Sequence, residues 1–256
     1  MRVRPSLLIV AVALGAFFAA QTALGSPPAD PDTQVPALDF QQVAAVTPAK
    51  PAAPKPAAPK PYRLAVLRGE LPLSDRPGGA ATGSLGATTE FGSRHVLGVA
   101  AQRRNWLGVV TSARPNGRLA WVRRDQVEIE RTRWSLHADL SARTLTLRRN
   151  GRKVHRLAVA IGRPGSETPT GRFAVTDKLA GSNYGPYYGC CVLALNGHQP
   201  NTPAGWKGGN RLAIHGTDTP GTIGTAASAG CLRASDADLE LLMAKVPLGT
   251  PVFVHA

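Results

Sequence analysis

Short apolar runs, separated by turn residues, follow one another from Tyr62 to the end of the chain. Gly and Pro, of which the sequence has 27 and 22, mark many of the boundaries between these runs. Within the runs apolar and polar residues alternate, as they do in strands that bury one face. Strands of this length and spacing are typical of small barrels and sandwiches. We therefore predict a mainly β protein.

Residues 62–130 hold the first group of runs. They are Arg63–Leu67, Leu71–Leu73, His95–Val99, Trp106–Val110 and Leu119–Val122. The stretches Trp106-Leu107-x-Val and Gly117-Arg118-x-x-Trp121-Val122 resemble the two tryptophan-bearing strands of bacterial SH3-like domains. This resemblance implies a small SH3-like barrel that binds peptidoglycan peptides. Packing of Trp106 and Trp121 in a protein core is the alternative, because large aromatic side chains are mostly buried.

Residues 131–256 form a second predicted unit. Alternating runs at 144–147 and 154–161 flank Asn150-Gly151, a residue pair typical of a tight hairpin turn. A strand is also expected over Tyr187–Leu195, and another over Arg211–His215. The unit should therefore again be built mainly from strands.

One segment of the second unit has the pattern of a helix. Ser235 is a suitable N-cap, and Asp238 three residues later completes a capping box in its Asp form. The apolar residues that follow recur at helical spacing, namely Leu239, Leu242, Met243 and Val246. Pro247-Leu248-Gly249 then ends the segment. A short helix should thus begin directly after Arg233.

The beginning of the chain has the features of an export signal. A basic start, Met1–Arg4, precedes the apolar stretch Leu7–Ala20 and the small residues at 23–25. We predict a signal peptide over residues 1–25, with an uncleaved membrane anchor as the alternative. Residues 26–61 are rich in Pro, Ala and Lys, so they should form an extended, unfolded linker. Both alternatives place the folded units outside the cytoplasm, in the cell wall, the periplasm or the extracellular space.

The chain carries a formal net charge of +14. A basic exported protein is expected to approach polyanions, such as wall polymers and lipid head groups. Its cations are scattered along the chain and are not interleaved with aromatic residues, which argues against nucleic acid as a partner. Contact with a membrane is expected only through the N-terminal segment, if that segment is not cleaved.

The sequence has three cysteines, Cys190, Cys191 and Cys231. An odd number in an exported protein leaves at least one thiol outside any intramolecular disulfide. Cys190 and Cys191 would point to opposite faces of a strand, so we expect no bridge between them. A disulfide between Cys231 and one of these two is the structural alternative to a free, reactive Cys231. A metal site is not expected, because the chain has no Cys-x-x-Cys or His-x-x-x-His pair.

Two nearby stretches bring together the side chains that acyl transfer on cysteine requires. They are Ile214-His215-Gly216-Thr217 and Ser228-Ala229-Gly230-Cys231-Leu232-Arg233. The thiol of Cys231 is a candidate nucleophile, and His215 is a candidate base. Arg233 lies on the same side of an extended chain as Cys231, where its guanidinium could bind a substrate carboxylate.

These stretches, in this order, resemble the signature of L,D-transpeptidases of the YkuD type. Ile161-Gly162 and the segment Thr168–Phe173 match an upstream strand and loop of that family. The resemblance covers about the C-terminal half of the chain. It implies a β-sandwich that remodels peptidoglycan through an acyl-enzyme on cysteine, and it implies no cofactor.

The resemblance also assigns roles to single residues. The carbonyl of Gly216 should orient the ring of His215, and so fix its tautomer. Gly230 permits a close backbone approach, and the amides of Gly230 and Cys231 are candidates for an oxyanion hole. Ser228 should support the loop by hydrogen bonding. Ala229 departs from the family pattern, which commonly has histidine there, so His215 is left as the only base.

The function predicted is that of a peptidoglycan L,D-transpeptidase. Cys231 would be acylated by a donor stem peptide and would then pass the acyl group to an amine. A carbapenem should act as an inhibitor by acylating the same thiol. Two alternatives remain: a Cys–His hydrolase, acting as an L,D-carboxypeptidase or endopeptidase, and a catalytically inactive wall-binding protein. His198 is a weaker candidate for the rim of the site, and Tyr184, Tyr187 and Tyr188 are candidates for a lid, with loop packing as the alternative.

Overall fold

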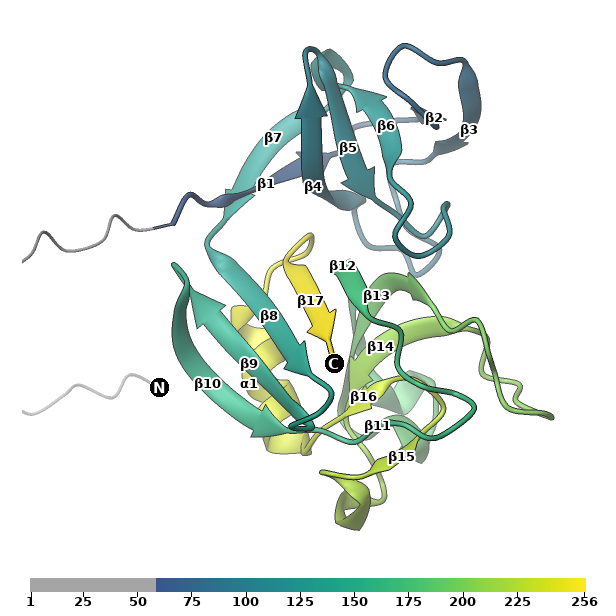
Figure 1. Cartoon of the computed structure of the whole chain (residues 1–256), viewed down its shortest axis with the longest axis vertical. Coiled ribbons are helices and arrows are strands. Elements are labelled where there is room, and N and C mark those ends of the chain that lie inside the picture. The colour runs from purple at the N-terminus through teal and green to yellow at the C-terminus, as the bar shows by residue number, and fades with distance from the viewer. Residues whose placement is uncertain (1–58) are drawn as a thin grey trace, which may run out of the picture. The chain divides into compact units, whose positions relative to one another are not determined.

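The computed structural model describes residues 59–256 (Figure 1). The predicted signal peptide or anchor, and nearly all of the predicted linker, lie outside the described residues. Among residues 59–256, no helix has the length and apolar character that crossing a membrane requires. The described strands fall into two groups, which follow one another in the sequence.

The first group covers residues 62–132 and forms one seven-stranded sheet. Its strands are β1 (Tyr62–Val66), β2 (Leu71–Ser74), β3 (Ala81–Leu85), β4 (Val96–Arg103), β5 (Trp106–Val110), β6 (Ala120–Arg123) and β7 (Glu128–Thr132). They are hydrogen-bonded in the order β3-β2-β6-β5-β4-β1-β7. Each of the five predicted runs carries a strand, whereas β3 and β7 were not predicted. The SH3-like character of this unit stays a prediction.

The core of the first unit is small and aliphatic. It includes the fully buried side chains of Leu73, Leu107 and Val109. Trp121 is buried, and Trp106 is partly buried. The two tryptophans are thus largely packed, in line with the core-packing alternative for them.

The second group forms an eight-stranded sheet and a two-stranded sheet. Its strands are β8 (Trp134–Asp139), β9 (Thr144–Arg149), β10 (Arg152–Ala158), β11 (Ile161–Gly162), β12 (Gly171–Ala180), β13 (Cys191–His198), β14 (Arg211–His215), β15 (Ala226–Ser228), β16 (Leu232–Arg233) and β17 (Pro251–His255). The large sheet has the order β10-β9-β8-β17-β12-β13-β14-β16, and β11 pairs with β15. This sheet is curled, and the mainly β prediction is confirmed (Figure 1).

The predicted hairpin is present between β9 and β10, which pair in antiparallel register. Its turn residues, Asn150 and Gly151, have φ values of 52° and 75°. Positive φ at both positions is the requirement of a type I′ turn, and Asn-Gly meets it at little cost. The dipeptide therefore fixes the register of this edge of the sheet.

The predicted helix is α1 (Asp236–Lys245), the one α-helix in residues 59–256. The side chain of Ser235 caps it by accepting a hydrogen bond from the Asp238 N–H at 3.2 Å. Leu239, Leu242 and Val246 are fully buried against the core of the large sheet. The cap and this apolar face place the start of α1 directly after β16.

The expected strand over Tyr187–Leu195 is wrong in its first half. Tyr187 and Tyr188 lie in a 3₁₀ turn, η3 (Pro186–Tyr188), and β13 begins only at Cys191. Gly185 and Gly189 flank η3 with φ values of 95° and 59°, conformations that favour glycine and break a strand. The apolar side chains at the start of this stretch therefore pack in a turn and not in a strand.

The expectation that Cys190 and Cys191 do not bridge each other is also wrong. The structure joins them in a disulfide and leaves Cys231 free. The expectation assumed that both residues lie on a strand, but Cys190 precedes β13. The bond excludes the alternative in which Cys231 is consumed by a structural disulfide.

Candidate active site

Two adjacent strands hold the histidine and the arginine of the candidate site. β14 and β16 run parallel, and their register places Ile214 beside Leu232 and His215 beside Arg233. β16 has only two residues, but backbone hydrogen bonds to Ala160 hold it from its other side at 2.7 and 3.0 Å. β14 and Ala160 therefore fix this part of the site from the two sides of β16.

His215 is fully buried, and one of its ring nitrogens is anchored. Nδ1 lies 2.6 Å from the carbonyl oxygen of Gly216, so Nδ1 carries the proton and donates it. Nε2 is left as an acceptor, and it has no hydrogen-bond partner among residues 59–256. The pKa of His215 is lowered to about 4, chiefly by burial and also by the charge of Arg233, whereas the hydrogen bond to Gly216 acts in the opposite direction. The imidazole is thus neutral at neutral pH, with a free basic nitrogen.

Cys231 lies on the loop between β15 and β16, and its thiol is free. Its Sγ is 3.9 Å from the carbonyl oxygen of Arg211 on β14. Burial raises the pKa of the thiol to about 11, although the Ala213 N–H and the charge of Arg233 act in the opposite direction. In this conformation the site therefore holds a neutral thiol and a neutral imidazole.

Two tyrosines of η3 lie beside both His215 and Cys231. The ring of Tyr188 is 4.8 Å from that of His215, and the ring of Tyr187 is 5.5 Å from it. Burial raises the pKa of both phenols, and a charge on Cys231 would raise it further. These contacts place His215 and Cys231 beside the same pair of rings.

The guanidinium of Arg233 is buried next to the thiol. The residue is 4% exposed, its Nε has no hydrogen-bond partner in the described part of the chain, and its Cζ lies 5.5 Å from the centre of the Tyr187 ring. A buried cation with an unsatisfied donor costs free energy unless an anion binds it. The arrangement therefore suits a bound carboxylate.

A tight turn shapes the backbone before the thiol. Ser228, fully buried, donates from Oγ to the Cys231 carbonyl at 2.6 Å and accepts from the Gly230 N–H at 3.0 Å. The expected support of the loop by Ser228 is thus present. The Gly230 N–H, however, is already used in this turn, which leaves it unavailable to an oxyanion in this conformation.

Gln199, which sequence analysis did not single out, ties this turn to two other loops. Its Nε2 lies 3.1, 3.0 and 3.3 Å from the carbonyl oxygens of Ser166, Glu167 and Ala229. A Cβ at Gly230, whose φ is +121°, would stand 2.1 Å from the same nitrogen. Gly230 is therefore required where the backbone closely approaches the buried amide of Gln199.

The segment 199–210 covers the thiol. The cavity in which Cys231 lies measures about 20 Å³ and is also lined by Tyr187, Gln199 and Trp206. The Trp206 ring packs edge-on against Tyr187, and its Nε1 donates to the Gly209 carbonyl at 2.7 Å. A cavity of this size holds about one water molecule, although Cys231 itself is partly exposed, so the room for a peptide beside the thiol depends on how these loops lie.

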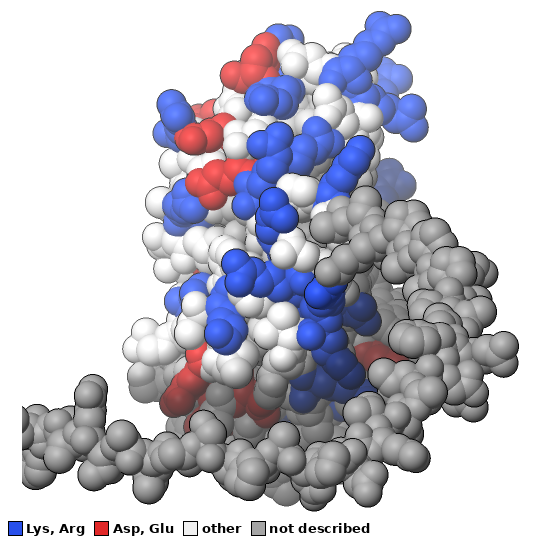
Figure 2. All heavy atoms as spheres, turned by 90° about the vertical axis from the view of Figure 1, so that its left-hand side faces the viewer, with Lys and Arg blue, Asp and Glu red and all other residues white. Residues whose placement is uncertain are grey.

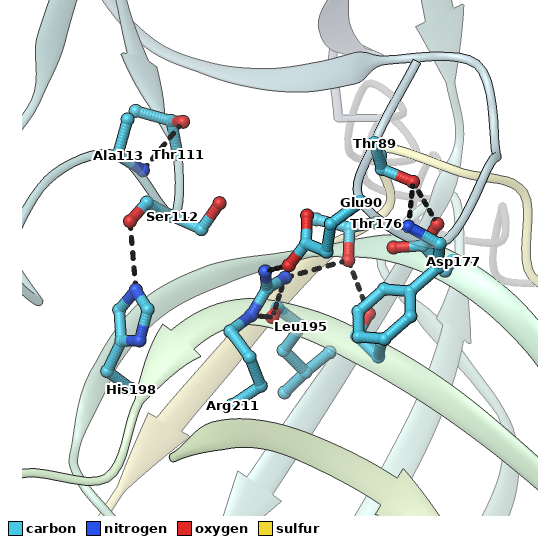
Figure 3. Close-up of polar contacts among 12 residues, drawn as sticks. Thr89, Glu90, Thr111, Ser112, Ala113, Thr176, Asp177, Leu195, His198 and Arg211 are labelled. Atoms are coloured by element: carbon cyan, nitrogen blue, oxygen red, sulfur yellow. Dashed lines mark hydrogen bonds and ion pairs between the residues drawn. The ribbon is translucent and has the colours of Figure 1, made fainter. Parts of the chain in front are cut away.

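The first unit contacts the strands that carry the site (Figure 3). The side chain of Asn116 forms two hydrogen bonds with the backbone of His198, at 2.6 and 2.9 Å. The ring of His198 points to the Ser112 carbonyl at 2.9 Å, as Figure 3 shows, and Arg211 on β14 pairs with Glu90. Between these loops lies an open groove of about 640 Å³, lined by Ser112, Asn116 and His198 among others. His198 thus borders a groove beside the cover, in which the first unit takes part.

The family model that matches this chain covers the second unit. Residues 133–254 match the family model of the L,D-transpeptidase catalytic domain, YkuD. A stretch of 122 residues of the chain is 31% identical to the putative L,D-transpeptidase YkuD of Bacillus subtilis. The match covers 48% of this chain and 66% of that protein, so the chain spans just under two thirds of its relative.

Solved structures of similar chains include two L,D-transpeptidases. One is L,D-transpeptidase 3 from Mycobacterium tuberculosis with a faropenem-derived adduct, with 18% identity, a TM-score of 0.41, and 54% of this chain and 73% of that chain covered. The other is the L,D-transpeptidase LdtMt1 in complex with imipenem, with 17% identity, a TM-score of 0.41, and 77% and 100% covered.

Proposed function

Because residues 133–254 match the family model of the L,D-transpeptidase catalytic domain, YkuD, we propose that the protein is a peptidoglycan L,D-transpeptidase with Cys231 as its nucleophile. Export to the cell envelope is part of this proposal, since peptidoglycan lies outside the cytoplasm. No cofactor is needed, because the thiol, the imidazole and backbone amides supply the chemistry.

The observation that carries the proposal is the state of His215. Its Nδ1 is held by the Gly216 carbonyl, and its buried Nε2 has no partner. A structural histidine in a core would satisfy both nitrogens, because an unpaired buried polar atom costs about 1–3 kcal/mol. The free Nε2, in the strand beside the free thiol, is what a general base requires.

Acylation begins when the Sγ–H of Cys231 turns from the Arg211 carbonyl towards Nε2 of His215. Nε2 takes the proton as Sγ attacks the carbonyl carbon of the bond that precedes the terminal D-alanine of a stem peptide. The tetrahedral intermediate collapses, and the imidazolium returns the proton to the departing amine of D-alanine. A thioester on Cys231 and free D-alanine are the products of this half-reaction.

Transfer repeats these steps in the opposite direction. The amine of a second stem peptide attacks the thioester carbonyl and gives its proton to Nε2. The intermediate expels the Cys231 thiolate, which takes the proton back from the imidazolium. The result is a new amide bond between two stems and a regenerated thiol.

Arg233 and a backbone amide are assigned to binding. The buried guanidinium, whose Nε is unpaired, suits the carboxylate of a donor stem. The Cys231 N–H is the oxyanion donor we assign, because the Gly230 N–H is held by Ser228 Oγ. Donors of this kind contribute about 3 kcal/mol each to acyl transfer in other enzymes.

Covalent labelling tests the proposal. Intact mass after incubation of the full chain with imipenem should rise by one drug adduct, and Cys231→Ala should show none. An unlabelled wild type, or an adduct that persists in Cys231→Ala, would exclude Cys231 as the nucleophile.

Product analysis then separates transfer from hydrolysis. With a tetrapeptide donor and an acceptor amine, the transferase should release D-alanine and form the cross-linked product. Release of D-alanine with no dependence on the acceptor, and no cross-link, would instead identify a carboxypeptidase.

A further inference from the structure

The turn of the β9–β10 hairpin gathers five cations. We call this group the basic tip: Arg133, Arg148, Arg149, Arg152 and Lys153. Four of its members are exposed, and Arg148 is partly exposed. Figure 2 shows the face that includes the left-hand side of Figure 1, where β9 and β10 lie, and Lys and Arg outnumber Asp and Glu on it.

The register of the hairpin places cations directly opposite one another. Arg149 pairs with Arg152, and Arg148 pairs with Lys153, across β9 and β10. Like charges in such cross-strand pairs destabilise a sheet, because their side chains project from the same face at short range. The Asn150-Gly151 turn fixes this register, so the strands cannot slip to separate the charges.

No carboxylate of the described residues relieves this repulsion. Within residues 59–256, no member of the basic tip takes part in an ion pair shorter than 4.0 Å. Arg149 instead packs over the Trp134 ring at 5.2 Å, and Arg133 donates to the side chain of Asn150 at 3.0 Å. The Nε of Arg148 is buried and has no hydrogen-bond partner in this same part of the chain. Arg133 and Arg149 are therefore held in place by neutral groups, and the charges of the tip remain available to bind an anion.

We propose that the basic tip is a binding surface for a flexible polyanion that carries phosphate groups. Four of the five cations are arginines, whose planar forks fit phosphate oxygens in pairs. Successive anionic groups of one polymer chain can follow the cations around the hairpin turn and neutralise both like-charge pairs. A membrane is the less suitable partner, because the single exposed large apolar side chain on the hairpin is Val154.

The basic tip and the thiol lie at opposite edges of the large sheet. β10 is the first strand in its order, and β16, which follows Cys231, is the last. A polymer bound at the tip therefore leaves Cys231 free. The proposal stands apart from the proposed function, because it concerns retention of the protein on an anionic polymer rather than acyl transfer.

The test measures binding of the full chain to long-chain inorganic polyphosphate. For five phosphate contacts, the affinity should fall by about 100-fold between about 50 and about 200 mM NaCl, by analogy with single-stranded nucleic acid. The double variant Arg152→Glu/Lys153→Glu turns both like-charge pairs into opposite-charge pairs. Its affinity for polyphosphate should fall at least tenfold, while its Tm in the absence of ligand should rise by about 1–4 °C.

A charge-matched variant controls for net charge. Arg103→Glu/Arg118→Glu alters two exposed cations outside the tip and changes the charge by the same amount. It should keep its affinity within about twofold. Labelling of Cys231 by imipenem, measured on both variants, shows that each is folded at the distant site.

Several outcomes would overturn the proposal. Equal losses in the two double variants would mean that net charge alone drives binding, and an unchanged affinity in the tip variant would mean that the tip is not the site. Tighter binding to vesicles of anionic phospholipid than to polyphosphate would assign the tip to a membrane. Tighter binding to oligothymidylate would assign it to single-stranded nucleic acid.

Discussion

The two sides of the Cys231 site are held by different kinds of structure. His215 and Arg233 lie on paired strands, β14 and β16, and both are at least 96% buried. Tyr187 and Trp206, on the opposite side, belong to a 3₁₀ turn and to an irregular segment, and are only partly buried. The candidate base and the buried cation are thus placed by the sheet, whereas the groups beside the thiol on the other side are placed by loops.

This difference separates chemistry from access. A strand in the middle of a sheet opens only at a large fraction of the global unfolding free energy, while loops open at much less. The sheet can therefore hold Nε2 of His215 without a partner, and the loops can admit a peptide to a cavity of about 20 Å³. Changes on the strand side should alter the chemical step, and changes on the loop side should act mainly through position and entry.

The largest effect is expected on the strand side, from His215→Gln. Gln removes the basic nitrogen but keeps an amide N–H that can reach the Gly216 carbonyl. The rate of acylation of Cys231 by imipenem should fall by about 10²–10⁴-fold, the usual contribution of a general base. Stopped-flow or time-resolved intact mass measures it.

The control is His255→Gln, which changes an exposed histidine on β17. It should acylate at the wild-type rate. If His215→Gln also kept that rate, the strand side would not hold the base, and the division between the two sides would fail.

The next effect is on stability as a function of pH. The pKa of His215 is about 4 in the folded chain and ordinarily 6.5, so the unfolded chain binds a proton that the folded chain does not between these values. Stability is therefore complete above about pH 6.5 and is lost as the pH falls towards 4, by about 3 kcal/mol. In His215→Gln this part of the loss should disappear, which urea unfolding at several pH values measures.

Cys231 should limit the stability of the fold at the alkaline end of the pH range. Its pKa is raised from 9.0 to about 11 in the folded chain, so the unfolded chain loses its proton first as the pH rises. Stability should fall between these values, and Cys231→Ala should remove that fall.

The two acid unfolding profiles decide the prediction for His215. If the wild type and His215→Gln lost the same stability between pH 6.5 and about 4, the imidazole would not be buried as the structure has it.

On the loop side, Gln199→Glu should slow acylation about tenfold or more. The ionised carboxylate would face the carbonyl oxygens of Ser166, Glu167 and Ala229 and would donate nothing to them. The backbone next to Cys231 would then be pushed out of place. Because a protonated Glu regains one donor, lowering the pH to about 5 should restore part of the rate relative to wild type.

Gln199→Met is the matched variant, since it keeps the length of the side chain without its charge. It should show a smaller loss and no recovery at low pH. An unchanged acylation rate in Gln199→Glu would show that Gln199 does not position the thiol.

The sequence predicts the strand side far better than the loop side. The apolar alternation into His215, the Asn150-Gly151 turn and the Ser235 cap are local signals, each set by a few neighbouring residues. They lead to β14, the hairpin and α1 as the structure has them. The pair of nearby motifs then indicates a thiol and an imidazole in one site.

Long-range contacts escape such local signals. Gln199 acts on Ala229 across 30 residues, and nothing near it in the sequence marks it as buried. Tyr187 and Tyr188 resemble the start of a strand, but two glycines at positive φ turn them onto His215. The two-residue strand β16 forms only because Ala160 and β14 flank it, so it too depends on tertiary structure.

The smallest effect is expected where the first unit touches the loop side. Asn116→Ala removes two hydrogen bonds to the backbone of His198, at the end of β13. Each is worth about 0.5–1.5 kcal/mol, so the free energy of unfolding should fall by about 1–3 kcal/mol. Acylation of Cys231 should change by less than about threefold, because β14 and β16 keep their own hydrogen bonds.

The control is Gln126→Ala, on an exposed 3₁₀ turn of the same unit, which should change neither the free energy of unfolding nor the rate of acylation. A tenfold loss of acylation in Asn116→Ala, with the Gln126 variant unaffected, would show that contact with the first unit governs the reacting groups as well, and that the sheet alone does not hold them.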